Sequence, residues 1–165
     1  MSTKKLTMLS SAVALAMVMS FLETLIPPLA SVPGMKIGLA NIVTVFLLYT
    51  YTWREAAGVS IIRVCLSALL FGSSVSLIYS ASGALLSFVG MILIKRLKIS
   101  SALSVSVVGG VLHNAGQIIC ACIIMENAAI SLYLPPLIIS GTVAGVAVGA
   151  ASYILIRKLS WLSRR

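Results

Sequence analysis

Long apolar stretches, separated by charged residues or by Pro and Gly, divide the chain into six segments. A helix needs about 20 mostly apolar residues to cross the hydrocarbon of a bilayer, and most of these stretches approach that length. Because the connections are short, the pattern predicts a single all-α integral membrane domain over residues 1–165. The six expected transmembrane helices cover residues 8–26, 36–52, 56–71, 74–94, 102–125 and 135–156.

Composition supports the membrane interpretation, and the distribution of charge indicates how the chain is oriented in the membrane. Hydrophobic residues make up 60% of the chain and charged residues 9%, and the mean hydropathy is +1.14, far from a soluble domain. The net charge of +9 gathers at the termini and in the second and fourth connections, so we expect no nucleic-acid partner. The positive-inside rule then places both termini in the cytoplasm. The ten basic residues concerned are Lys4, Lys5, Arg54, Lys95, Arg96, Lys98, Arg157, Lys158, Arg164 and Arg165.

The first apolar stretch follows two lysines, as the apolar part of a signal peptide would. It is long, however, and it lacks an A-x-A cleavage site. We therefore interpret it as a retained first transmembrane helix.

Arg63 lies outside the basic clusters, near the middle of the third expected helix. A charge in hydrocarbon costs about 2.5 kcal/mol or more and normally faces the bundle interior, paired with another group. Ser60 and Ser67 lie at i−3 and i+4 from Arg63 and share its helix face. Arg63 therefore needs a partner on another helix.

Polar residues of the other helices can supply such partners. Each of these residues also has a purely structural explanation. Glu23 and Arg63 can form an ion pair, and Lys36 can extend its ammonium group into water. His113 and Gln117 can form hydrogen bonds that hold helices together. Their accumulation between the outer surface and the midplane favours a small-molecule site open to the extracellular side. The residues expected to bind the substrate are Glu23, Lys36, Asn41, Arg63, Tyr79, His113, Asn114 and Gln117.

These residues also limit which kinds of ligand the site can hold. The cations Lys36 and Arg63 outnumber the one carboxylate, so the site should favour a carboxylate or phosphate held by charge-assisted hydrogen bonds. The amides suit a heterocycle or an amide, and Tyr79 with nearby aliphatic residues can cover an apolar portion. We expect a partly anionic small molecule.

Signatures of enzymes are missing from the chain. It has no aspartate, so an aspartate-rich magnesium diphosphate motif is impossible, and it has no G-x-x-x-x-G-K-[ST] sequence for ATP. No G-x-S-x-G sequence supports a serine nucleophile. The three cysteines, which fall in apolar stretches, are expected to be small buried hydrophobic residues. We expect no enzyme activity, no catalytic residues, no metal site and no cofactor.

Small residues mark two further helix faces. Gly141, Gly145 and Gly149 recur every four residues in the last helix, a pattern that allows close backbone approach. The fourth helix has a similar strip, and we expect the two strips to pack together inside the bundle. That strip contains Ser76, Ser80, Gly83, Ser87 and Gly90.

The first helix has a pair of small residues, Ala12 and Ala16, that can dock a partner helix. Glu23 lies on nearly the same stripe, so a Glu23 that faces the interior turns this pair inward too. Ser10 and Ala14, on the opposite face, are the alternative docking pair.

Two motifs indicate a family. The segment Pro33-Gly34-Met35-Lys36-Ile37-Gly38-Leu39-Ala40-Asn41-Ile42 and the segment His113-Asn114-Ala115-Gly116-Gln117, together with Glu23 and Arg63, resemble the bacterial Gx transporter family, which is also described as heptaprenyl diphosphate synthase component I. The resemblance extends over nearly the whole chain.

That family is similar to the substrate-binding S components of energy-coupling factor importers, which are six-helix proteins of the bacterial cytoplasmic membrane. The resemblance implies capture of a vitamin or cofactor precursor, with a separate transmembrane coupling protein and ATPase subunits as partners. The synthase description implies an alternative, a noncatalytic membrane accessory for making heptaprenyl diphosphate or a menaquinone precursor. A purely structural membrane subunit is the third alternative.

Overall fold

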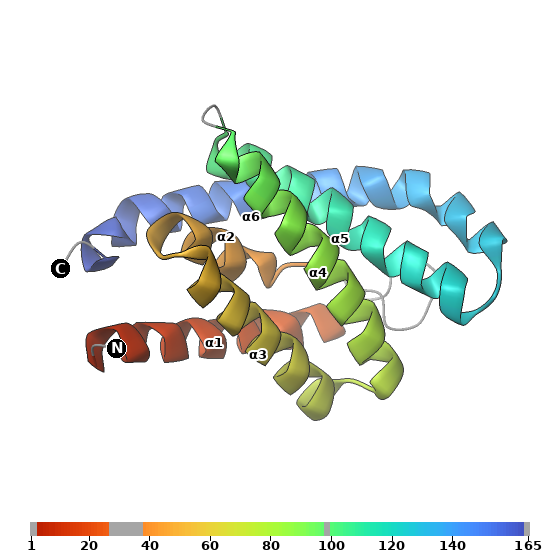
Figure 1. Ribbon diagram of the computed structural model, residues 1–165, viewed down its shortest axis with the longest axis horizontal. Coiled ribbons are helices and arrows are strands. Elements are labelled where there is room, and N and C mark those ends of the chain that lie inside the picture. The colour runs from red at the N-terminus through yellow and green to blue at the C-terminus, as the bar shows by residue number, and fades with distance from the viewer. Residues whose placement is uncertain (1–2, 27–37, 98–99, 164–165) are drawn as a thin grey trace.

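The computed structural model describes residues 3–26, 38–97 and 100–163. They are almost entirely helical and contain no strand, which confirms the all-α class (Figure 1). The start of α1 and the end of α6 lie at the same end of the molecule (Figure 1). The elements are α1 (Thr3–Thr24), α2 (Asn41–Thr50), α3 (Trp53–Phe71), α4 (Ser74–Arg96), α5 (Ala102–Ile124), the 3-10 helix η1 (Ala128–Tyr133) and α6 (Leu134–Ser163).

Four helical stretches in the described part of the chain are long and apolar enough to cross a membrane: Thr3–Thr24, Ser74–Arg96, Ala102–Ile124 and Ala128–Leu159. By contrast, α2 has only 10 residues, and α3 has 19 residues that include three charged ones. Many large apolar side chains are exposed on the outside of the bundle, as lipid contact requires. The chain is a multipass membrane protein.

The start of α2 differs from expectation by five residues. The expected helix starts at residue 36, whereas α2 starts at Asn41. The turn before it contains Gly38 with a φ of 91°, a conformation that other residues rarely adopt. Lys36 lies outside the described residues. In addition, α1 starts earlier than expected, α6 ends later, and η1 precedes α6.

Polar side chains cap several helices where the sequence places Ser or Asn. The hydroxyl oxygens of Ser73 and Ser101 each accept a hydrogen bond of 3.2 Å from a backbone N–H three residues later. Asn127 does the same for η1 through the N–H of Ala129, at 2.9 Å. These caps satisfy backbone donors that the first helical turn leaves unpaired.

Glycines on two faces of α5 allow α4 and α6 to approach it closely. Toward α4, a Cβ atom added at Gly116 would lie 2.8 Å from the carbonyl oxygen of Ser82. Toward α6, a Cβ atom at Gly110 would lie 2.4 Å from the carbonyl oxygen of Gly141. Neither contact leaves room for a side chain, so the backbones themselves are packed together.

The expected pairing of α4 with α6 is wrong. A Cβ atom at Gly145 would lie 2.6 Å from the Cα of Val107, and one at Gly149 would lie 2.9 Å from the Cα of Leu103, so the α6 glycines face α5. In the described part of the chain α4 and α6 do not contact each other. Both small-residue faces pack inside the bundle, but α5 separates them.

Apolar side chains surround α2. Val45 and Leu48 are fully buried and pack with Ala16 of α1, Met91 of α4 and Val105 of α5. A helix of 10 residues is too short to cross the bilayer, so the backbone polar groups at its ends need protein partners that lipid cannot supply. This explains why the short α2 lies in the interior of the bundle.

Lys95, near the end of α4, closes the C-terminal end of α2. Its ammonium group donates to the carbonyl oxygen of Leu48 and lies 5.2 Å from the centroid of the Tyr49 ring. The Tyr49 hydroxyl in turn donates to the carbonyl oxygen of Ser100, at 3.3 Å. The bond from Lys95 satisfies one terminal carbonyl group of α2, and the Tyr49 hydroxyl ties the same helix end to the segment before α5.

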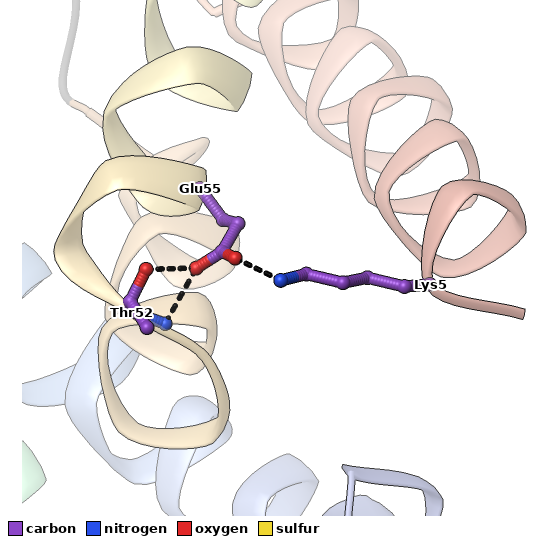
Figure 2. A network of polar contacts seen from close by, with 3 residues as sticks. All are labelled: Lys5, Thr52 and Glu55. Atoms are coloured by element: carbon purple, nitrogen blue, oxygen red, sulfur yellow. Dashed lines mark hydrogen bonds and ion pairs between the residues drawn. The ribbon is translucent and has the colours of Figure 1, made fainter. Parts of the chain in front are cut away.

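A small polar network joins α1 to the start of α3 (Figure 2). Lys5 forms an ion pair with Glu55, and Glu55 accepts a hydrogen bond of 2.8 Å from the backbone N–H of Thr52 and another from its hydroxyl. Hydrogen bonding to Lys5, with a further contribution from Thr52, lowers the pKa of Glu55 to about 2. The network therefore requires an ionised Glu55.

We predict that Gly110→Ala destabilises the protein by about 1–3 kcal/mol, because the new methyl group collides with the backbone of α6. Gly58→Ala is the matched control, since a Cβ atom there meets nothing within 4 Å and Ala favours a helix over Gly. Thermal unfolding of both variants in detergent measures the difference. Equal stability of the two variants would contradict the close contact of α5 and α6.

We predict that the Lys5–Glu55 pair adds pH-dependent stability. Because the folded state lowers the pKa of Glu55, the contribution is present above about pH 4.5 and is lost as the pH falls toward 2. Its size is about 1 kcal/mol or less, since the pair is partly exposed. Glu55→Gln should lower the unfolding temperature more at pH 7 than at pH 2.5, whereas Glu126→Gln, in an exposed turn, should change neither.

Candidate functional site

Glu23, in the last turn of α1, ties that helix to the turn before α2. Its side chain is 5% exposed, and Oε1 accepts hydrogen bonds from the backbone N–H groups of Gly38 and Leu39, the second at 2.7 Å. An ionised acceptor makes these bonds stronger than neutral ones. One carboxylate therefore fixes the position at which the chain enters α2.

The turn at Gly38 touches two of the expected site residues. A Cβ atom on Gly38 would lie 3.0 Å from Nδ2 of Asn41 and 3.4 Å from Cδ2 of His113. Gly38 thus lies against both side chains, with no room for a side chain of its own. Sequence reasoning placed Gly38 in a family motif but not in the site, and its positive φ became evident only from the structure.

His113 and Gln117 form one buried pair on α5. Their Nε2 atoms are 3.3 Å apart, and both side chains are at most 2% exposed. On the α4 side, a Cβ atom at Gly83 would lie 3.0 Å from both Cγ of Gln117 and Cε1 of His113. The glycine of α4 therefore makes the space that these two side chains fill.

Arg63 is also buried, with 5% of its surface exposed. Its guanidinium lies in the electrostatic field of Glu23. Its Nε and Nη2 atoms are buried without a hydrogen-bond partner in the described part of the chain. Each unsatisfied buried donor costs about 1–3 kcal/mol, and more when it is charged.

Three other helices also contribute buried polar atoms that form no hydrogen bond with the described residues. Ser20 Oγ lies one turn before Glu23 on α1, and Asn41 Nδ2 and Ser80 Oγ lie on α2 and α4. None of the three has a hydrogen-bond partner among the described residues. Ser20 was missed from the sequence, although its spacing of three residues from Glu23 is a helix-face signal.

Asn114 and Tyr79 have other surroundings. Asn114 donates from Nδ2 to the carbonyl oxygen of Leu137 at 2.7 Å and to Ser140 Oγ at 3.4 Å, so its amide braces α5 against α6. Tyr79 is buried in an apolar cluster that includes Ile118 of α5. The contacts thus connect Glu23, Asn41, His113 and Gln117 through Gly38 and Gly83, with Arg63 near Glu23.

The space beside this cluster is narrow. A crevice lined by Gly38, Asn41, Ser106 and Gly110, with three residues of α6, has no volume for a water molecule. Between these described residues of α2, α5 and α6, the structure leaves no room for a ligand.

The expected docking pair on α1 points partly inward. Ala16 is 1% exposed and belongs to the apolar core, and Ala12 is half-buried beside it. Ser10 and Ala14, on the opposite face, are exposed.

Fold and site together define an all-helical membrane protein with a buried polar cluster contributed by several helices. Residues 12–155 match the family described as heptaprenyl diphosphate synthase component I, and the chain belongs to that family. The match confirms the resemblance drawn from the two sequence motifs. No curated protein and no solved structure matches the chain.

We predict that Glu23→Ala accelerates amide hydrogen exchange at Gly38 and Leu39, because both N–H groups lose their acceptor. Glu126→Ala removes a carboxylate from an exposed turn and should leave this segment unchanged. Exchange measured by mass spectrometry on the peptide that spans the start of α2 reports the difference. Unaltered protection in Glu23→Ala would contradict the role assigned to the carboxylate.

Proposed function

We propose that the protein is the substrate-binding membrane subunit of an importer for a vitamin or cofactor precursor, and that it captures a partly anionic small molecule from the extracellular side. In this proposal the chain passes through the bacterial cytoplasmic membrane six times, with both termini inside. The observation that carries the proposal is Arg63, a buried cation whose Nε and Nη2 donors lack a hydrogen-bond partner in the described residues. A carboxylate or phosphate group satisfies both donors at once.

The carboxylate of Glu23 forms no hydrogen bond with the Nε or Nη2 atom of Arg63. Its Oε1 atom already accepts from two backbone N–H groups, so this oxygen is engaged at the turn before α2. A bound anion beside Arg63 would compensate the remaining guanidinium donors, and the His113–Gln117 pair offers neutral hydrogen-bonding groups for the rest of the molecule.

The packing of α3 offers a way to open the cluster. An apolar groove of about 510 Å³ lies between parts of α3 and α4, lined by residues such as Ala57, Leu77 and Phe88. The tight glycine contacts of the bundle lie instead between α5 and its two neighbours. We propose that α3, which carries Arg63, shifts into this groove when the ligand enters.

The proposed energy source is a separate transmembrane coupling protein with ATPase subunits, because this chain has no P-loop sequence. The exposed pair Ser10 and Ala14 offers a small-residue face on α1 for that partner, while Ala16 faces inward.

We predict that Arg63→Gln reduces ligand retention at least about tenfold, since a hydrogen bond to a charged group contributes about 1.5–3 kcal/mol. Native mass spectrometry of the detergent-purified protein detects a co-purifying small molecule and its loss. Arg54→Gln is the matched control, because Arg54 lies on the same helix but is exposed and stacks on Trp53.

His113→Ala should also reduce retention, with membrane insertion unchanged. Retention of the same ligand by Arg63→Gln, His113→Ala and the unaltered protein would leave the cluster with a purely structural role. The proposed binding function would then fail.

The family description favours a second candidate, a noncatalytic membrane accessory in the synthesis of heptaprenyl diphosphate or a menaquinone precursor. This candidate requires that the purified chain stimulate prenyl diphosphate formation by a soluble synthase. Absence of any stimulation in a reconstituted membrane would count against it, and the mass of the co-purifying ligand separates isoprenoids from other compounds.

A further inference from the structure

A second apolar groove lies between α1 and α6, away from the polar cluster. Both helices contact α2, but in the described part of the chain they do not contact each other. Because α2 is buried behind them, the two helices become the walls of a groove of about 150 Å³. Its lining residues are Met8, Ser11, Ala12, Leu15, Val43, Phe46, Leu155 and Leu159.

Positive charge stands at one end of this groove. Lys4 precedes Met8 by four residues and so continues the groove face of α1, about 6 Å toward its start. Lys158 follows Leu155 by three residues on α6. Both lysines are exposed, and the two helix ends that carry them lie at the same end of the molecule (Figure 1). Lys5, by contrast, is paired with Glu55.

We propose that this groove binds an anionic phospholipid, with an acyl chain between α1 and α6 and the phosphate group between Lys4 and Lys158. The lining is almost wholly apolar, so hydrocarbon fills it better than water does. The lysine side chains can lie along the helix surface and reach the phosphate with their ammonium groups. The apolar groove suits the hydrocarbon part of an amphipathic anion, and the lysines at its end suit the anionic group.

The size of the groove favours a lipid chain over another helix. A helix with its side chains is about 10–12 Å wide, whereas this groove holds about 150 Å³ between two helices that flank a buried third. A segment of one acyl chain can lie in a groove of this size without separating α1 from α6, and the rest of the chain then lies in the surrounding bilayer. The surface for a partner helix remains on the other face of α1, at Ser10 and Ala14.

The test uses the full chain in nanodiscs of mixed phosphatidylglycerol and phosphatidylcholine, followed by native mass spectrometry of the released protein. We expect phosphatidylglycerol to be retained preferentially. The double variant Lys4→Gln/Lys158→Gln should reduce that preference by roughly tenfold, because each basic group near an anionic lipid contributes favourably. Added inorganic phosphate should not displace the lipid, since it cannot fill the groove.

The matched control is Arg96→Gln/Arg157→Gln, which removes the same charge from exposed positions elsewhere. Arg157 is two residues from Leu155 and therefore on the opposite face of α6. A second comparison fills the groove: Ala12→Leu should weaken phosphatidylglycerol retention, whereas Ala14→Leu, on the exposed face, should not.

Three results would overturn the proposal. Equal losses in the two charge variants would indicate a diffuse surface effect. Unchanged retention in Lys4→Gln/Lys158→Gln would remove the lysines from the site. A dimer of the chain that Ala12→Leu disrupts, in place of lipid adducts, would assign the groove to a second copy.

Discussion

The close approach of α4 and α6 to α5 is the constraint on which the rest of the structure depends. In hydrocarbon, apolar side chains gain little by leaving lipid, so helices associate through tight packing and through the polar groups they share. Gly110 and Gly116 provide that packing on two faces of α5, because a Cβ atom at either would collide with a neighbouring backbone. The same helix carries His113 and Gln117, and the approach of α4 at Gly83 encloses them.

The polar cluster combines groups with satisfied and unsatisfied hydrogen bonds. The Oε1 atom of Glu23 accepts from two backbone amides and therefore stabilises the turn before α2. Arg63 and Asn41 hold donors that the described residues do not satisfy, and such donors are expensive in a low-dielectric interior. If these side chains served only the fold, hydrogen-bond partners within the protein would remove this free-energy cost. These unsatisfied donors are the basis of the ligand-binding role that we propose.

Much of this architecture follows from the sequence, since hydropathy and charge alone indicate an all-helical multipass protein. The start of α2 did not follow, because it depends on the positive φ of Gly38, which composition does not reveal. Residue spacing identified the small-residue faces of α4 and α6 but not the helix that each face packs against. Both faces pack against α5, which has glycines on two sides. Asn114 is a further example. An asparagine side chain can bind a ligand, but the fold places this amide against the carbonyl oxygen of Leu137, to which it donates a hydrogen bond.

The shortness of α2 has an electrostatic consequence. Ten residues cover about 15 Å, half of a hydrocarbon core of about 30 Å. Because the turn at Gly38 lies against His113, in the middle of α5, α2 begins inside the membrane. The aligned peptide dipoles place a partial positive charge at that end. Glu23 is its counterion, so the carboxylate neutralises a helix terminus as well as bonding two amides.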